Sequence, residues 1–118
     1  MKYMLMIYND AEVWNGLSSE EHQAVWSEGG RRWQDLMDSG EGIMGEPFAA
    51  PGDAHIVRVR DGMAEVTDGP FSAAKDQFVG FLLIDVANEE RAIEIAKSWP
   101  DAKYSALEVR LINVANAK

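Results

Sequence analysis

The sequence feature that most constrains the fold is the Asp61-Gly62 dipeptide, which lies between two runs of alternating apolar residues. Both central residues of a type I′ turn need a positive φ, which Asp and Gly tolerate, so this dipeptide predicts a β-hairpin with a two-residue loop. Such a loop also fixes the pairing register. We therefore expect opposed pairs that run from Arg60 and Met63 next to the turn to His55 and Asp68 at the open end.

This register gives the predicted hairpin one charged face and one apolar face, because side chains alternate along a strand. Arg58 lies opposite Glu65 on the charged face. The apolar face collects Val57, Val59, Ala64 and Val66. At the far end of this valine face, His55 and Asp68 should lie side by side. We expect the valine face to point inward, which would place the His–Asp pair at the edge of the core.

Length and composition indicate one domain that spans residues 1–118. A chain of this size buries roughly two-thirds of its unfolded surface, which is enough for a core. It contains no Cys, which excludes disulfides and Cys-based metal sites. A net charge of −9 disfavours nucleic acids and anionic membranes. No apolar run suits a signal peptide or approaches the ~20 residues of a membrane span, so we expect a cytoplasmic protein.

The other elements are predicted from hydrophobic periodicity and from helix start and stop signals. They are strands over 1–8, 42–48, 78–86 and 107–111, a helix that starts at Ser18 and Ser19, before Glu20, and runs to about Ser39, and a helix between Asn88 and Pro100. The segment between the first strand and the first helix resembles a loop. This order predicts an α+β ferredoxin-like sandwich with both helices on one sheet face. A homodimer packed sheet to sheet would cover the other face.

The first predicted helix combines an apolar stripe with two adjacent glycines. The stripe consists of Trp26, Trp33, Leu36 and Met37. Gly29 and Gly30 inside a helix cost about 1 kcal/mol each relative to Ala, which indicates either close packing or a kink. Trp26 and Trp33 are then either core residues or the walls of a pocket between helix and sheet.

Several segments resemble the YCII-related proteins, in the branch with an Asp-Gly-Pro-Phe (DGPF) motif. The segments are 1–5, 57–62, 67–71 with Lys75, 80–85 and 107–110. The resemblance covers nearly the whole chain and implies a dimeric α/β-barrel of ferredoxin-like fold. It also implies a link to muconolactone-isomerase-like and dehalogenating enzymes, for which a shared His–Asp active site has been suggested. Members of this branch are often associated with extracytoplasmic-function sigma factors.

The resemblance places the Asp of that pair at Asp68 and its His, which lies on the first helix, at His22. The hairpin register offers His55 as the alternative partner. An Asp beside a His fixes the imidazole tautomer and raises its basicity, which suits proton transfer near neutral pH. Structural interpretations stay open: Asp68 as a turn residue that accepts backbone hydrogen bonds, His55 as a strand-end residue, and His22 as a surface residue of the first helical turn.

Glu46, Lys75 and Phe71 complete the candidate site, together with Trp26 and Trp33 as ligand contacts. Glu46 either faces the pocket or ends a solvated strand. Lys75 either binds an anionic substrate or forms a surface ion pair. No metal-ligand spacing, Gly-rich phosphate loop or Ser nucleophile elbow is found, so we expect no metal and no cofactor.

Three functions remain open at this point. The first is a small-molecule-binding homodimer that isomerises a small organic acid, or eliminates a group from it, through Asp68 and a His. The second is a non-catalytic ligand-binding or regulatory module associated with a sigma factor. The third is a dimeric scaffold in which the motif at 68–71 only shapes a loop. The sequence does not decide whether the chain is an enzyme.

Overall fold

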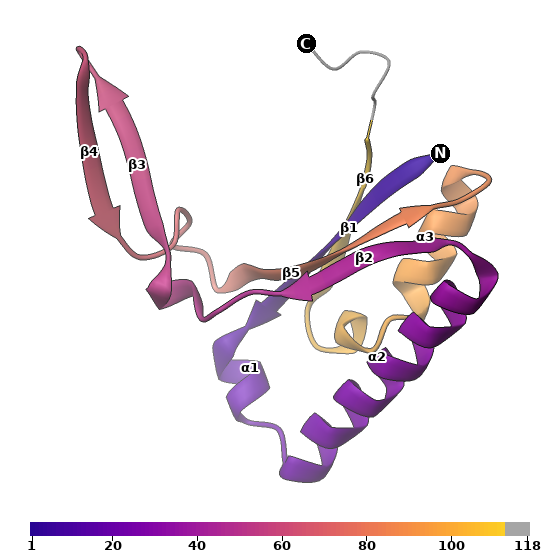
Figure 1. Ribbon diagram of the computed structural model, residues 1–118. Helices are drawn as coiled ribbons and strands as arrows, with labels where there is room; N and C mark the ends of the chain where they lie inside the picture. Colours follow the sequence, from indigo (N-terminus) through magenta and orange to yellow (C-terminus); the bar gives the residue numbers. More distant parts are fainter. Residues whose placement is uncertain (113–118) are drawn as a thin grey trace.

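A four-stranded antiparallel sheet lies at the centre of the computed structural model, which describes residues 1–112 (Figure 1). Its strands are β1 (Lys2–Asp10), β2 (Gly42–Pro47), β5 (Asp76–Asp85) and β6 (Ala106–Leu111), in the spatial order β2-β5-β1-β6. The helices α2 (Ser19–Ser39) and α3 (Glu89–Ser98) pack on the same face of this sheet (Figure 1). This arrangement confirms the predicted ferredoxin-like α+β fold.

Both long helices begin where the capping signals predict. The Ser18 hydroxyl accepts a hydrogen bond from the Glu21 N–H (3.1 Å), and the Glu21 carboxylate accepts one from the Ser18 N–H (2.9 Å), which forms a capping box. Gly40 ends α2 in the left-handed conformation, with φ of 80°. The Asn88 side chain accepts a hydrogen bond from the Arg91 N–H (2.9 Å) and caps α3.

The hydrophobic core lies between the sheet and the two helices. Tyr3, Leu5 and Ile84 contribute the largest fully buried side chains from the sheet. The helix side contributes Leu36, Ala92, Ile95, Ala96 and Trp99. The apolar stripe of α2 differs from the prediction: Val25 and Leu36 are buried, whereas Trp26 is 61% exposed and Met37 46%. The sheet therefore sets the rotation of α2 about its axis.

An ion pair joins the residue after the α2 cap to α3. The Arg91 guanidinium donates from Nε and Nη2 to the two Glu41 carboxylate oxygens, at 2.9 and 2.8 Å. This bidentate contact holds the pKa of the Glu41 carboxyl below its usual range. It links the two helices across the same sheet face.

Residues 11–15 form the short helix α1 (Ala11–Asn15), where the sequence predicted a loop. The Asp10 carboxylate explains the helix start, because it accepts a hydrogen bond from the Glu12 N–H (2.9 Å). A helix of this length is too short to show a hydrophobic period. Its contribution is to place Trp14, which is half-buried, beside the start of α2.

The predicted hairpin forms, with strands β3 (His55–Arg60) and β4 (Met63–Asp68). Its register is the predicted one, from Arg60 opposite Met63 to His55 opposite Asp68. The turn residues Asp61 and Gly62 have φ of 51° and 76°, as a type I′ turn requires. The local prediction of register and turn is confirmed.

The prediction that the valine face points into the core is wrong. The hairpin forms its own two-stranded sheet and projects away from the body (Figure 1). Val57, Val59 and Val66 are 64%, 67% and 64% exposed. The physical reason lies in the connection: the chain leaves the central sheet after Pro47 and passes through the 3₁₀ turn η1 (Pro51–Asp53), so β3 and β4 pair only with each other.

The projecting hairpin also makes the molecule extended. Its radius of gyration is 16.3 Å, against about 13 Å for a compact domain of roughly this length. Among residues 1–112, no helix is both long enough and apolar enough to span a membrane.

Candidate functional site

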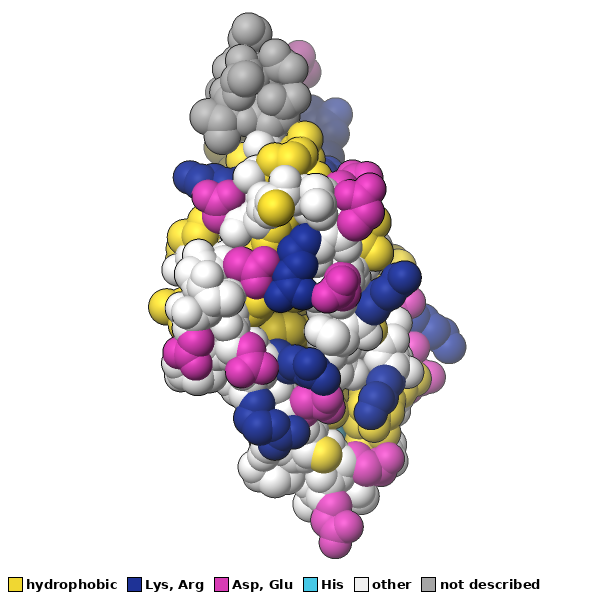
Figure 2. All heavy atoms as spheres, turned by 90° about the vertical axis from the view of Figure 1, so that its right-hand side faces the viewer, with side chains coloured by type: hydrophobic (Ala, Val, Ile, Leu, Met, Phe, Trp, Pro, Cys, Tyr) yellow, Lys and Arg dark blue, Asp and Glu magenta, His cyan; other side chains and the backbone are white. Residues whose placement is uncertain are grey.

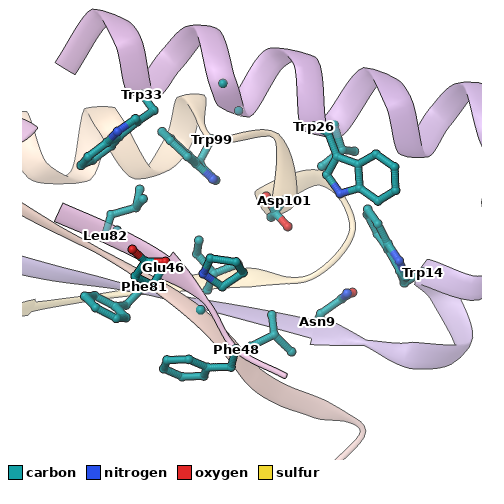
Figure 3. A pocket seen from close by; sticks show the side chains of 18 residues that line it. Asn9, Trp14, Trp26, Trp33, Glu46, Phe48, Phe81, Leu82, Trp99 and Asp101 are labelled. Carbon is teal, nitrogen blue, oxygen red and sulfur yellow. The ribbon is translucent and has the colours of Figure 1, made fainter. Parts of the chain in front are cut away.

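A cavity of about 510 Å³ lies between α2 and the sheet (Figure 3). Sites for small organic molecules occupy about 300–1,000 Å³, so the cavity has a suitable size. Its walls come from α2, from β2 and β5, and from the segment after α3. The fold thus places a pocket where the sequence allowed one, between the first long helix and the sheet.

The glycine pair of α2 leaves space on the helix surface that faces this cavity. A Cβ atom on Gly29 would lie 3.9 Å from Pro100 Cγ and 4.0 Å from Trp99 Cζ2, in ordinary contact. A Cβ atom on Gly30 would meet nothing within 4 Å. Because α2 continues through both residues, the pair does not break the helix; a side-chain Cβ would fit in ordinary contact at position 29 and would meet open space at position 30.

A second pair of glycines brings β2 and β5 close together at the cavity. A Cβ atom on Gly80 would lie 3.0 Å from the Glu46 carbonyl oxygen and 3.2 Å from Pro47 Cα. A Cβ atom on Gly45 would lie 2.9 Å from Leu82 Cδ2. The absence of side chains at these two positions lets β2 approach β5 and places Glu46 and Pro47 at the edge of the cavity.

All four tryptophans of the chain line the cavity. Figure 3 shows Trp33 and Trp99 on one side of Asp101 and Trp26 and Trp14 on the other. The ring centroids of Trp14 and Trp26 are 6.0 Å apart. Trp99 is 6% exposed and Trp26 61% exposed, so the aromatic wall runs from the core to the open mouth of the cavity.

Asn9 and Asp101 are the polar non-aromatic side chains that the described lining residues present to the cavity. Glu46 lines the cavity with its backbone, since its pairing with Phe81 places its side chain on the sheet face opposite Leu82. Asp101 belongs to the 3₁₀ turn η2 (Pro100–Lys103) that follows α3. Burial raises the pKa of the Asp101 carboxyl, because a carboxylate loses hydration there. The cavity is therefore an aromatic pocket with a few convergent acceptor groups.

The predicted contact between His55 and Asp68 is confirmed. His55 Nδ1 and Asp68 Oδ1 are 2.9 Å apart, and the side chains are 65% and 87% exposed. The N–H of Gly69, whose φ is 102°, donates to the Ala54 carbonyl oxygen (2.7 Å). The Asp68 carboxylate therefore binds the His55 imidazole, while the N–H of the next residue, Gly69, is hydrogen-bonded to the Ala54 carbonyl oxygen and not to the carboxylate. The pair lies at the foot of the hairpin, outside the set of residues that line the cavity.

His22 has a different partner. Its Nε2 lies 2.7 Å from the Trp14 carbonyl oxygen, and its ring stacks on the Trp14 ring with centroids 4.3 Å apart. A carbonyl oxygen only accepts, so Nε2 carries the hydrogen in this contact. His22 thereby supports Trp14, a wall of the cavity, whereas Asp68 is bound by His55.

The remaining candidates separate into two groups. Trp26, Trp33 and Glu46 line the cavity. Phe71 and Lys75 lie elsewhere: Phe71 is 75% exposed, with the Arg58 guanidinium 5.3 Å from its ring centroid, and Lys75 Nζ is 3.7 Å from an exposed Glu12 carboxylate. Within residues 1–112, no three His, Asp or Glu side chains are grouped so that they could hold a metal ion.

Sequence reasoning missed part of the lining, namely Asn9, Trp14, Phe48, Trp99 and Asp101. Trp14 lies in the segment that the sequence predicts to be a loop, and Trp99 lies at the end of the second helix. Asp101 comes after the Pro that ends this helix, in a position without any motif. Trp99 and Asp101 reach the cavity because η2 packs against α2.

The fold and the cavity define a class of protein: a ferredoxin-like sandwich with an aromatic pocket between its long helix and its sheet. The chain belongs to the family of the YCII-related domain, which it matches over residues 1–115. It is similar to "Uncharacterized protein R00369" of Rhizobium meliloti (strain 1021), with 30% identity over 112 residues that cover 93% of this chain and 90% of that protein. The family resemblance seen in the sequence is confirmed.

Proposed function

We propose that the chain binds a small organic molecule in the cavity between α2 and the sheet. The observation that carries this proposal is the meeting of all four tryptophans around one cavity of about 510 Å³. Ligand sites in proteins are mostly apolar and aromatic, with a few polar groups that orient the ligand. Asn9 and Asp101 are such groups here.

The neutral dye dansylamide tests this proposal, because tryptophans that line the site should transfer excitation energy to a bound dansyl group. We expect saturable energy transfer with the native chain. The Gly30→Leu substitution should weaken dye binding by about 10-fold or more, which corresponds to about 1.4 kcal/mol. The reason is that a side chain at position 30 would occupy cavity space that is now open.

Two control variants make the test specific. Ser27→Leu adds the same side chain to an exposed position of α2 outside the cavity lining, and Asp68→Asn changes the hairpin pair. Both should bind dansylamide as the native chain does. The proposal fails if energy transfer does not saturate, or if Gly30→Leu binds the dye as well as Ser27→Leu does.

Acid–base chemistry at His55 is a second candidate function, which the 2.9 Å contact with Asp68 favours. A carboxylate only accepts, so His55 donates from Nδ1 and Nε2 keeps a free lone pair. Hydrolysis of p-nitrophenyl acetate measures the reactivity of this nitrogen. We expect His55→Ala and Asp68→Asn to lower the rate more than His22→Ala does, since His22 Nε2 is held by the Trp14 carbonyl group. Equal rates in the three variants would remove this candidate.

We further propose a homodimer that packs through the open face of the sheet. Side chains alternate along a strand, so the face opposite Tyr3 and Leu5 is the one that α2 and α3 leave free (Figure 1). Its central strands carry Met4, Met6, Tyr8, Phe81 and Leu83, which follow from the β1–β5 register. Its edge strands add Glu46 and the ion pair between Glu108 and Arg110. By contrast, the side shown in Figure 2, over α2 and α3, mixes acidic and basic side chains as solvent-facing surfaces do. A second copy would cover the apolar face.

Light scattering tests this assembly. The native chain should have twice the mass of one chain, and Met6→Glu should have the mass of a single chain, because a carboxylate would be buried without a partner at the interface. Gln23→Glu adds the same charge to an exposed position of α2 and should stay dimeric. A native chain that is monomeric at all concentrations would contradict the proposal.

A regulatory module is the alternative to an enzyme, and the projecting hairpin is the segment that would contact a sigma factor. Co-purification of a sigma factor with the native chain, and its loss when Val57 and Val59 are replaced by Ser, would support that alternative. Retention of the factor by this variant would rule out the hairpin as the contact.

A further inference from the structure

Asp101 is the ionisable side chain that the described lining residues present to the cavity, because Glu46 pairs with Phe81 and its side chain lies on the opposite face of the sheet. None of the described lining residues is basic, and three basic side chains have partners outside the cavity. Lys75 faces Glu12, Arg91 binds Glu41 and Glu94, and Arg58 lies over Phe71. The electrostatic character of the pocket is therefore negative.

The aromatic walls of the cavity also favour a positively charged ligand. The face of an aromatic ring carries partial negative charge, and a cation within about 6 Å of the ring centroid is attracted to it, most strongly by Trp. The cavity offers Trp14, Trp26, Trp33 and Trp99 around the Asp101 carboxyl group (Figure 3). Several indole rings with a carboxylate between them form an arrangement that suits a positively charged group with apolar substituents.

We infer that the ligand of this cavity is an organic cation, an amine or quaternary ammonium compound whose apolar body packs against the indole rings. The inference rests on the proposed binding function of the cavity and names its ligand class. The ammonium group would lie near Asp101, with indole rings on its other sides. The volume of about 510 Å³ leaves room for a body of one or two rings.

The burial of the Asp101 side chain agrees with a cationic ligand. The pKa of its carboxyl is raised because the charged form has lost water, and no ion pair of Asp101 is found among residues 1–112. The carboxylate thus lacks a cationic partner in this part of the chain. A bound cation supplies that partner, so the carboxylate and the ammonium group compensate each other's desolvation. An organic acid would instead bring a second negative charge beside the Asp101 carboxyl group. The structure thus favours a cation over the small organic acid expected from the family resemblance.

Three dansyl derivatives of similar size test the ligand class: dansylethylenediamine is cationic, dansylamide neutral and dansylglycine anionic at pH 7. Binding is measured by energy transfer from tryptophan in about 0.15 M salt, which screens long-range attraction to the net charge of −9. We expect the dissociation constant of the cationic dye to be lower than that of the anionic dye by about 10-fold or more. Equal binding, or tighter binding of dansylglycine, would overturn the inference.

Matched variants locate the origin of the preference. Asp101→Asn removes the cavity carboxylate, and the preference for the cationic dye should disappear. Asp53→Asn removes the same charge from an exposed position and should keep the preference. If both variants lose it equally, the preference comes from the overall charge and the inference fails. Should the Asp101→Asn variant not fold, the comparison of the three dyes with the native chain still decides the inference.

The outcomes separate this inference from the proposed function. If dansylamide binds and Gly30→Leu blocks it while the dyes show no charge preference, the cavity is a binding site but not one for cations. If none of the three dyes shows saturable energy transfer, the proposed binding function itself fails.

Discussion

Replacing Leu5 by Ala should lower the free energy of unfolding by about 3–5 kcal/mol, the largest effect that we expect from one substitution. Leu5 is 0% exposed and lies on the central strand β1, between Leu82 of β5 and Val109 of β6. Removal of its side chain would leave a cavity that strands paired on both sides cannot close. Urea denaturation followed by circular dichroism measures the change.

Val59→Ala in the hairpin is the matched control. Val59 is as apolar as Leu5 but 67% exposed, so its truncation should change the free energy of unfolding by less than about 0.5 kcal/mol. A loss at Val59 as large as that at Leu5 would mean that the valine face of the hairpin is packed in the folded protein. It would then contradict the position of the core between sheet and helices.

Gly80→Ala should have the second largest effect, a loss of about 1–3 kcal/mol. The added Cβ atom would lie 3.0 Å from the Glu46 carbonyl oxygen and 3.2 Å from Pro47 Cα, both of them backbone atoms of β2. Backbone atoms of a paired strand cannot rotate away, so β2 must move. Because Glu46 and Pro47 line the cavity, dansylamide binding should weaken as well.

The same chemical change at Gly30 should have the opposite sign. A Cβ atom there meets nothing within 4 Å, and Ala is favoured over Gly inside a helix by about 1 kcal/mol. Gly30→Ala should therefore raise the midpoint of urea denaturation, whereas Gly80→Ala should lower it. A neutral or stabilising Gly80→Ala would show that β2 and β5 lie further apart than the structure places them.

The contact between His55 and Asp68 could be predicted from the sequence because its cause is local. Asp61 and Gly62 favour positive φ, a two-residue turn fixes the register, and the register determines every opposed pair back to His55 and Asp68. The same holds for α2, since Ser18, Glu21 and Gly40 carry the signals for its ends within a few residues of those ends.

The rotation of α2 about its own axis could not be predicted in this way. Trp26 and Met37 are apolar and fall on a helical stripe, yet the sheet packs against Val25 and Leu36. Periodicity shows that a helix has an apolar side, but the neighbouring element selects which of the adjacent positions is buried.

The sequence by itself determined the two long helices with their ends, the strand order along the chain, the hairpin register and the family, because each depends on residues close together in the chain or on the order of the elements. Only the tertiary structure decided that the valine face is exposed and that Trp14, Trp26, Trp33, Trp99 and Asp101 meet around one cavity. These residues come from α1, α2 and the segment around η2. Burial and cavities depend on what lies opposite a side chain, and that depends on how distant segments pack.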